Sequence, residues 1–89
     1  MSADFDRQRI DLWMWHARLV RTRSDAAALA NSGHVRVNGT RIRAAGRMVR
    51  PGDVLTVALD HGVRVVKVRA FVERRGPAPT GKGLYDELT

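Results

Sequence analysis

The apolar residues at the start of the chain recur at helical spacing. Between Arg7 and about Val20 they form one stripe, at Ile10, Trp13, Met14, Ala17 and Val20, because residues three and four apart share a helix face. A second stripe lies nearly opposite, at Leu12, Trp15 and Leu19. The pattern predicts a helix that is packed on two sides. We expect Trp13 in the core, while Trp15 either packs against another part of the chain or stacks on a nucleobase.

The next segment carries the signals of a second, capped helix. Thr22 is followed three residues later by Asp25, which is the spacing of a capping box, so the helix should begin at Arg23. Small apolar residues at positions 26, 29 and 30 would allow close packing on a neighbour. Gly33 supplies the left-handed residue that ends a helix. The free N–H groups at the start of this helix would favour an anion.

Beyond Gly33 the pattern changes to the two-residue period of a strand. Val35 and Val37 alternate with polar residues, and Asn38-Gly39 is typical of a tight hairpin. The hairpin and the start of the second helix would therefore bring polar groups to one edge of the domain. These groups are Arg21, Arg23, His34, Arg36 and the turn at Asn38.

Two longer strands are predicted after the hairpin. The first, at residues 54–59, follows a Pro51-Gly52 turn of type II. The second spans residues 63–73 and has an alternating apolar face. That face consists of Val66, Val68, Ala70 and Val72.

The order of these elements predicts an α+β domain, with two N-terminal helices packed on a small, twisted, mostly antiparallel sheet. We expect a disordered lead at residues 1–6, the domain at residues 7–75, and a flexible or docking tail at residues 76–89. The tail begins with a linker-like run rich in Gly and Pro. Residues 84–88 could dock as a helical turn over the second apolar stripe, at Leu12, Trp15 and Leu19.

The positive charge of the chain is concentrated in its middle. The 89 residues allow one small domain, and 16 Lys and Arg against 9 acidic residues give a formal charge of +7. Eight arginines and one acidic residue lie between residues 18 and 50. A local excess of this kind favours a face that binds nucleic acid. A basic surface that only interacts with solvent is the alternative.

Targeting and membrane signals are not found in the sequence. Cysteine is absent, which removes thiol chemistry and is compatible with the cytoplasm. The start of the chain has no apolar leader, and no run approaches the roughly 20 apolar residues of a membrane span. We therefore expect a cytoplasmic protein that has no contact with membranes.

Residues for catalysis or metal binding do not form a recognisable set. The three histidines lie far apart without ligands at metal spacing, so we expect no metal and no cofactor. His16 is expected at the helix surface, and His61 in a turn. Gly81-Lys82-Gly83 lacks the rest of a phosphate-binding loop. Asp11 could pair with Arg7, or it could orient an arginine that binds phosphate. An enzyme is not expected.

Several motifs together resemble a known family. The motifs are Arg9-Ile10-Asp11, Thr22-Arg23-Ser24, the series Ala26, Leu29, Gly33, Val35, Val37 and Asn38-Gly39, and Val49-x-Pro51-Gly52-Asp53. Over residues 9–59 they are similar to the RNA-binding domain named after ribosomal protein S4, with its αL RNA-binding motif. The context narrows the resemblance to the fifteen-kilodalton bacterial heat-shock protein and its shorter relative RqcP. That context is Trp13-x-Trp15-x-Ala17-Arg18, Arg74-Arg75-x-Pro77 and Leu84-Tyr85.

The resemblance implies a ribosomal role. Members of that family bind ribosomal RNA and tRNA on the large ribosomal subunit when a stalled nascent chain still carries its tRNA, in ribosome recycling and nascent-chain quality control. The RNA-facing residues would be Arg9, Arg23 and the turn Asn38-Gly39, with Thr22, Ser24 and His34 beside them. Two positions depart from the family pattern, because Leu12 and His34 stand where Lys is usual. The tail is also shorter than in the longer heat-shock members.

The leading hypothesis is a non-catalytic, monomeric RNA-binding protein in which the phosphates of a structured RNA sit at the start of the second helix. Further arginines would extend the positive field along the RNA backbone, namely Arg18, Arg21, Arg36, Arg41, Arg43 and Arg47. A general nucleic-acid protein could use the same face on DNA. The sequence also leaves open an accessory domain of an RNA-modifying enzyme and a chaperone for unfolded protein.

Overall fold

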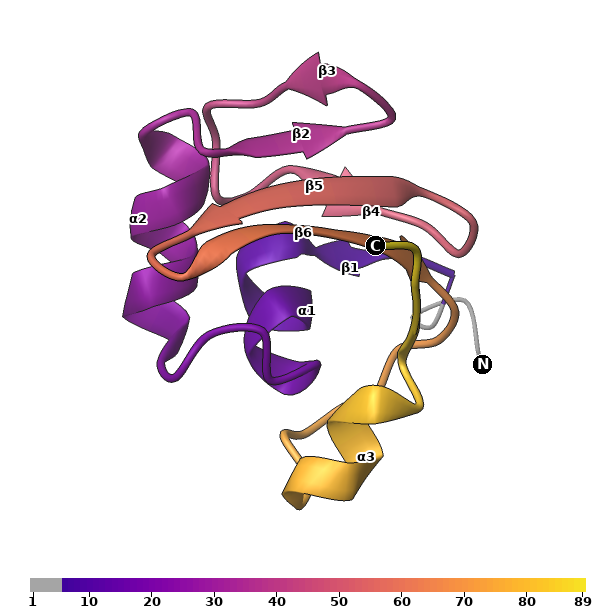
Figure 1. Ribbon diagram of the computed structural model, residues 1–89. Coiled ribbons are helices and arrows are strands. Elements are labelled where there is room, and N and C mark those ends of the chain that lie inside the picture. The colour runs from indigo at the N-terminus through magenta and orange to yellow at the C-terminus, as the bar shows by residue number, and fades with distance from the viewer. Residues whose placement is uncertain (1–5) are drawn as a thin grey trace.

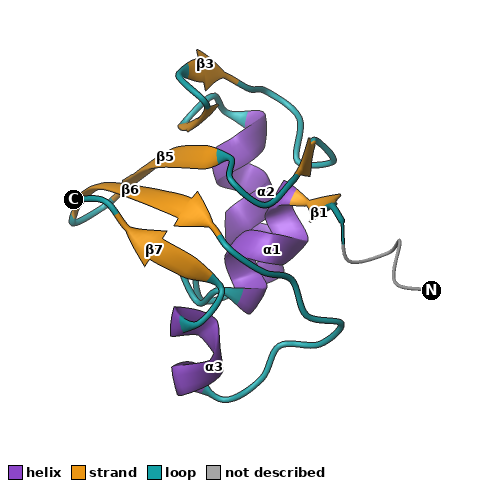
Figure 2. Ribbon diagram, turned by 90° about the vertical axis from the view of Figure 1, so that its right-hand side faces the viewer, coloured by secondary structure: helices purple, strands orange, loops and turns teal. Residues whose placement is uncertain are grey.

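Two helices cover one face of a five-stranded antiparallel sheet in the computed structural model, which describes residues 6–89 (Figure 1). Figure 2 shows β5, β6 and β7 one below another, with α1 and α2 on one side of them. The elements are β1 (Gln8–Arg9), α1 (Ile10–His16), α2 (Arg23–Asn31), β2 (Val35–Val37), β3 (Thr40–Arg41), β4 (Met48–Val49), β5 (Val54–Leu59), β6 (Gly62–Val68), α3 (Ala78–Lys82) and β7 (Tyr85–Glu87). The predicted α+β class is confirmed.

The strands of the main sheet follow the order β3-β2-β5-β6-β7, and β1 and β4 form a separate short pair. The register places Val35 opposite Val57, and Leu55 opposite Val66. Because side chains alternate along a strand, these residues share the face that the helices cover. The other face carries Arg36, which lies opposite both Arg41 and Thr56.

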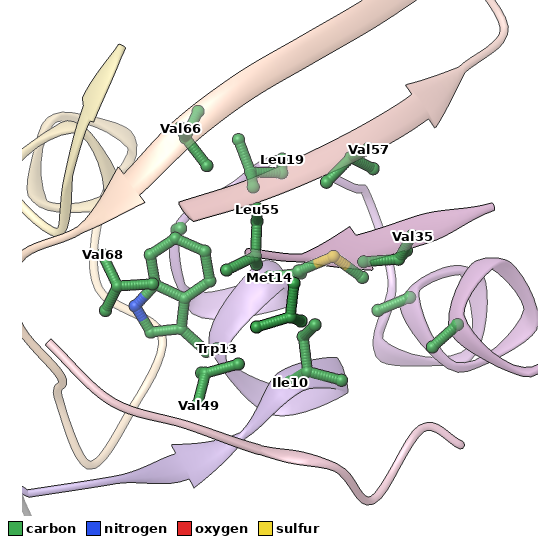
Figure 3. Packing of buried hydrophobic residues seen from close by; sticks show 14 of the residues in the cluster. Ile10, Trp13, Met14, Leu19, Val35, Val49, Leu55, Val57, Val66 and Val68 are labelled. Atoms are coloured by element: carbon green, nitrogen blue, oxygen red, sulfur yellow. The ribbon is translucent and has the colours of Figure 1, made fainter. Parts of the chain in front are cut away.

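The core lies between α1 and the covered face of the sheet (Figure 3). Ile10, Trp13 and Met14 of α1 are fully buried, as the helical stripe predicts. The indole N–H of Trp13 donates to the carbonyl oxygen of Ala70 at 3.0 Å, which satisfies the polar atom of this buried ring. Trp13 is therefore a core residue, and its partner comes from the far end of the sequence.

The first helix is shorter than predicted at both ends. Residues 8 and 9 pair with β4, and the N–H of Ile10 donates to the carbonyl oxygen of Arg47 at 2.8 Å. At the other end, Arg18 takes a left-handed conformation with φ of 61°, and the N–H of Leu19 donates to Met14. This turn places Leu19 in the core. The helix therefore stops at His16 because Leu19 is drawn inwards.

The predicted second helix and the turns are confirmed. α2 begins at Arg23, and the hydroxyl of Thr22 accepts a hydrogen bond from the N–H of Asp25 at 3.0 Å. Gly33 has a φ of 80°, which ends the helix as expected. Asn38 and Gly39 both have positive φ, as a two-residue hairpin turn requires.

The predictions for the C-terminal third are wrong in two respects. Strand β6 ends at Val68, so Ala70 is exposed and Phe71 is buried instead. Residues 76–83 contain the short helix α3, and the predicted helical turn at 84–88 is the strand β7. The edge of β6 offers free backbone groups, and Tyr85–Glu87 pair with it (Figure 2). The predicted lead at residues 1–6 lies outside the described residues apart from Asp6.

Candidate nucleic-acid interface

A buried carboxylate joins two arginines at the start of the helical layer. Asp11, in the first turn of α1, has a side chain that is 4% exposed, while those of Arg9 and Arg23 are 49% and 46% exposed. Arg9 donates from Nε and Nη2 to the two Asp11 oxygens at 3.1 and 3.0 Å. Nε of Arg23 lies 3.7 Å from Oδ2. Asp11 therefore pairs with Arg9 and Arg23. This agrees with the prediction that it orients an arginine, whereas the alternative prediction of a pair with Arg7 is wrong.

A backbone hydrogen bond also fixes the carboxylate of Asp11. The backbone N–H of Leu12 donates to its Oδ1 at 2.7 Å. Burial acts to raise the pKa of Asp11, but the hydrogen bonds from Arg9 and Leu12 and the charges of both arginines outweigh burial, so the pKa is lowered. Asp11 is consequently ionised near neutral pH, and it holds two half-exposed guanidinium groups in place.

The start of α2 adds backbone donors beside Arg23. The N–H of Ala26 makes the first helical hydrogen bond, to the carbonyl oxygen of Thr22, and Asp25 is capped by the Thr22 hydroxyl. Within the described part of the chain, the N–H groups of Arg23 and Ser24 have no acceptor in the protein. Free N–H groups at a helix start bind anions. The site therefore combines two oriented arginines with backbone donors.

The loop at residues 44–47, between β3 and β4, approaches Arg9. A Cβ placed on Gly46 would lie 3.8 Å from Cζ of Arg9, so the guanidinium group of Arg9 lies against the loop at residues 44–47. The carbonyl oxygen of Arg47 accepts from Ile10, which fixes this residue next to β1. Ala45 donates its N–H to the side chain of Asn31 at 2.9 Å. The loop thus connects Arg9 with the C-terminal end of α2.

A second cationic group lies at that end of α2 and on the uncovered face of the sheet. The side chains of Arg41 and Arg43 both approach Gly33, with atoms 3.3 Å from the position of a Cβ. Nδ1 of His34 is 3.1 Å from the hydroxyl of Ser32. The group borders a hollow of about 350 Å³ without a carboxylate in its wall. The lining residues are Ser32, Gly33, His34, Arg36, Arg41, Thr56, Ala58 and Val63.

Three predicted site residues lie apart from the pair of arginines that Asp11 holds. Arg18 lies beyond the C-terminal end of α1, and its guanidinium group donates to the carbonyl oxygen of Gly76. Arg21 lines a separate, largely apolar hollow beside the β5–β6 turn. The Asn38 side chain accepts from the N–H of Val54 and donates to Asp53, both within 3.1 Å. Its amide therefore holds the hairpin against the next turn, while Gly39 stays exposed.

The prediction for His16 is wrong, because its side chain is buried with 2% exposure. Its Nδ1 has no hydrogen-bond partner within residues 6–89. Burial lowers the pKa of His16, and the nearby positive charges of Arg23 and Arg75 lower it further. A hydrogen bond with the backbone of Val72 acts in the opposite direction but does not outweigh them. Local patterns could not reveal this in full, since Val72 and Arg75, which both act on the His16 imidazole, lie more than 50 positions later.

One known protein family matches the part of the chain that contains this site. The family model of the S4 domain matches residues 8–55. This chain belongs to the S4-domain family. The match covers Arg9, Asp11, Arg23 and the hairpin, and it ends within β5. Membership supports an RNA-binding role for the chain.

Within the S4-domain family, the chain resembles heat shock protein 15. It is 34% identical to the homologue from Haemophilus influenzae and 35% identical to the Escherichia coli K12 protein, each over 89% of this chain. It spans about 60% of the length of these curated relatives. The trimeric structure of heat shock protein 15 from Vibrio cholerae matches with a TM-score of 0.84 and 31% identity, covering 91% of this chain and 81% of that one. Ribosomal protein uS4 from Novosphingobium aromaticivorans is 32% identical over 79% of this chain and 36% of that protein.

The described residues offer little for other kinds of site. Among residues 6–89 there is no cluster of three or more side chains that could hold a metal ion. None of the helices in this range has the length and apolar character needed to cross a membrane.

Proposed function

We propose that this protein is a non-catalytic RNA-binding protein of the bacterial large ribosomal subunit. It would contact ribosomal RNA and tRNA in the cytoplasm and act in the recycling of stalled ribosomes and in nascent-chain quality control. The observation that carries the proposal is the buried Asp11, which orients Arg9 and Arg23 beside the free N–H groups of α2. The similarity to heat shock protein 15 supports the choice of a ribosomal partner.

The geometry favours recognition of a folded RNA backbone. Arg9 and Arg23 present guanidinium groups that can each donate two hydrogen bonds to a phosphate. The loop at residues 44–47 and the cationic group around Gly33 extend the positive surface. These contacts read the path of the backbone and not the base sequence. Neutralising about four to six phosphates would make log Kd rise steeply with log salt.

The experiment is sedimentation of tagged protein in a lysate at low salt, comparing wild type with Arg23→Ala. Arg74→Ala is the matched control, because it removes the same charge from an exposed residue outside the site. We expect wild type and the control to migrate with free large subunits and Arg23→Ala to remain at the top. Removal of Arg23 should cost about 1–3 kcal/mol in RNA binding, with little change in unfolding.

Two outcomes would contradict the proposal. Equal losses for Arg23→Ala and Arg74→Ala would mean that net charge alone governs binding. Migration of the wild type with DNA, and displacement by DNA as readily as by structured RNA, would favour a general nucleic-acid protein on the same surface.

A further inference from the structure

We propose that Arg75 is a positioning residue for the RNA site, acting through the connection between α1 and α2. The inference rests on the proposed function, and it concerns a residue that lies beyond the S4 match at residues 8–55. Arg75 does not belong to the cationic surface described above. It belongs to the segment between β6 and α3, which returns to the C-terminal end of α1.

The guanidinium group of Arg75 holds both ends of the connection. Its Nε donates to the carbonyl oxygen of Trp15 at 2.9 Å, and its Nη2 donates to the carbonyl oxygen of Val20 at 3.3 Å. Its Cζ lies 5.3 Å from the centroid of the Trp15 ring, which is the geometry of a cation–π contact. The side chain is half-buried. One group therefore spans residues 15–20 in a fixed geometry.

Gly76 and Gly81, which follow Arg75, also contact the connection between α1 and α2. Arg18 has the unusual φ of 61° and donates to the carbonyl oxygen of Gly76 at 2.9 Å. A Cβ on Gly81 would lie 2.9 Å from the carbonyl oxygen of Ala17, so this glycine permits close approach of α3 to the connection. Three parts of one segment thus contact the same turn.

The connection leads directly to the proposed RNA site. Val20 lies two residues before Thr22, whose hydroxyl caps α2, and Arg23 follows immediately. A residue in a left-handed conformation is costly unless its surroundings hold it. Without Arg75, residues 17–22 would sample other conformations, and the free N–H groups of α2 would be less well placed. RNA binding would then have to order the connection again.

The test compares Arg75→Ala and Arg75→Lys with two controls. Arg74→Ala removes the same charge from an adjacent exposed residue, and Val68→Ala weakens the core from strand β6. The measurements are the Kd for a structured ribosomal RNA fragment at several salt concentrations, amide hydrogen exchange, and the unfolding midpoint. We expect Arg75→Ala to raise Kd about fivefold with an unchanged salt slope, and to speed exchange in residues 17–25.

Lysine should not restore binding, because an ammonium group cannot hold two carbonyl oxygens in the fork that a guanidinium group provides. The inference is overturned if Arg75→Ala binds like Arg74→Ala, or if Val68→Ala weakens binding equally at matched destabilisation. It is also overturned if the salt slope falls by about one phosphate and Lys restores the Kd, since Arg75 would then contact RNA itself. If Arg23→Ala binds as tightly as wild type, the proposed function fails, while exchange in residues 17–25 still decides whether Arg75 holds the connection.

Discussion

Replacing Asp11 by Asn separates orientation from charge in the proposed site. The substitution keeps the shape of the side chain and one oxygen for the N–H of Leu12, but it removes the negative charge between Arg9 and Arg23. Net charge rises by one. A purely electrostatic surface would then bind RNA more tightly, whereas a site that depends on oriented arginines would bind less tightly.

The magnitudes decide which effect is larger. Losing the fixed orientation of two arginines costs about 0.5–1 kcal/mol each on binding, or about 1–2 kcal/mol in total. Removing one negative charge about 6 Å from a phosphate gains only about 0.7 kcal/mol in water, and less when salt screens it. Kd should therefore rise roughly twofold to tenfold. Stability should fall by about 1 kcal/mol, since both arginines are half-exposed and their ion pairs are weak.

The assay is fluorescence anisotropy with a structured RNA fragment at fixed salt, together with urea unfolding of the same preparations. Arg74→Ala again shows the effect of charge alone. Tighter binding by Asp11→Asn, with folding intact, would refute the argument that Asp11 orients the arginines. A loss of stability far above about 1 kcal/mol would show that the carboxylate is mainly a structural element.

Three further predictions concern the fold around the site. The pKa of His16 is lowered in the folded protein, so near pH 6.5 the unfolded chain takes up a proton that the folded protein does not. The stability that His16 contributes is therefore complete above this pH and falls as the pH drops toward the folded pKa. Urea midpoints between about pH 7.5 and 5 should show this slope, and His16→Gln should flatten it. Gly81→Ala should destabilise by about 1–3 kcal/mol, because its Cβ would collide with the Ala17 carbonyl oxygen, whereas Gly83→Ala has room at 3.5 Å. Asn38→Ala should cost about 1–3 kcal/mol through its two side-chain hydrogen bonds and its φ of 52°, measured by thermal unfolding.

Each of these has a clear contrary result. An unchanged pH slope in His16→Gln would mean that another group titrates. Equal losses for the two glycine variants would remove the argument for close approach at Gly81. A neutral Asn38→Ala variant would show that the hairpin needs only Gly39.

Local signals predicted the parts of the fold that local chemistry determines. Thr22 caps its own helix, Asn38-Gly39 forms its own turn, and the alternation at 54–59 is a strand with the predicted bounds. The predictions failed where distant residues decide the outcome. Helix α1 ends early because Leu19 enters the core, and His16 is buried near Val72 and Arg75 from the other end of the chain. Strand β7 has only three residues, too few for a recognisable period.

In the candidate site, too, local motifs were predictable and contacts between distant residues were not. The motif resemblance singled out Arg9 and Arg23, but their link through Asp11 depends on how α1 and α2 pack. Arg18 stays a predicted RNA-facing residue, but charge patterns do not reveal its left-handed conformation or its hydrogen bond to Gly76. Arg75 entered the sequence analysis only as part of the Arg74-Arg75-x-Pro77 motif. Its contacts could not be predicted, because its partners are backbone carbonyl groups 55 and 60 residues earlier.

The hydrogen bond from Trp13 to Ala70 has a consequence for how the chain folds during synthesis. Donor and acceptor are 57 residues apart, and the Gln8 side chain similarly reaches Val72 across 64 residues. Contacts at such long separation cannot form until both partners have left the ribosome. The first helix therefore cannot make its native contacts until almost the whole domain has been synthesised. We expect translation intermediates shorter than about 70 residues to remain sensitive to protease, and folding to occur in one late, cooperative step.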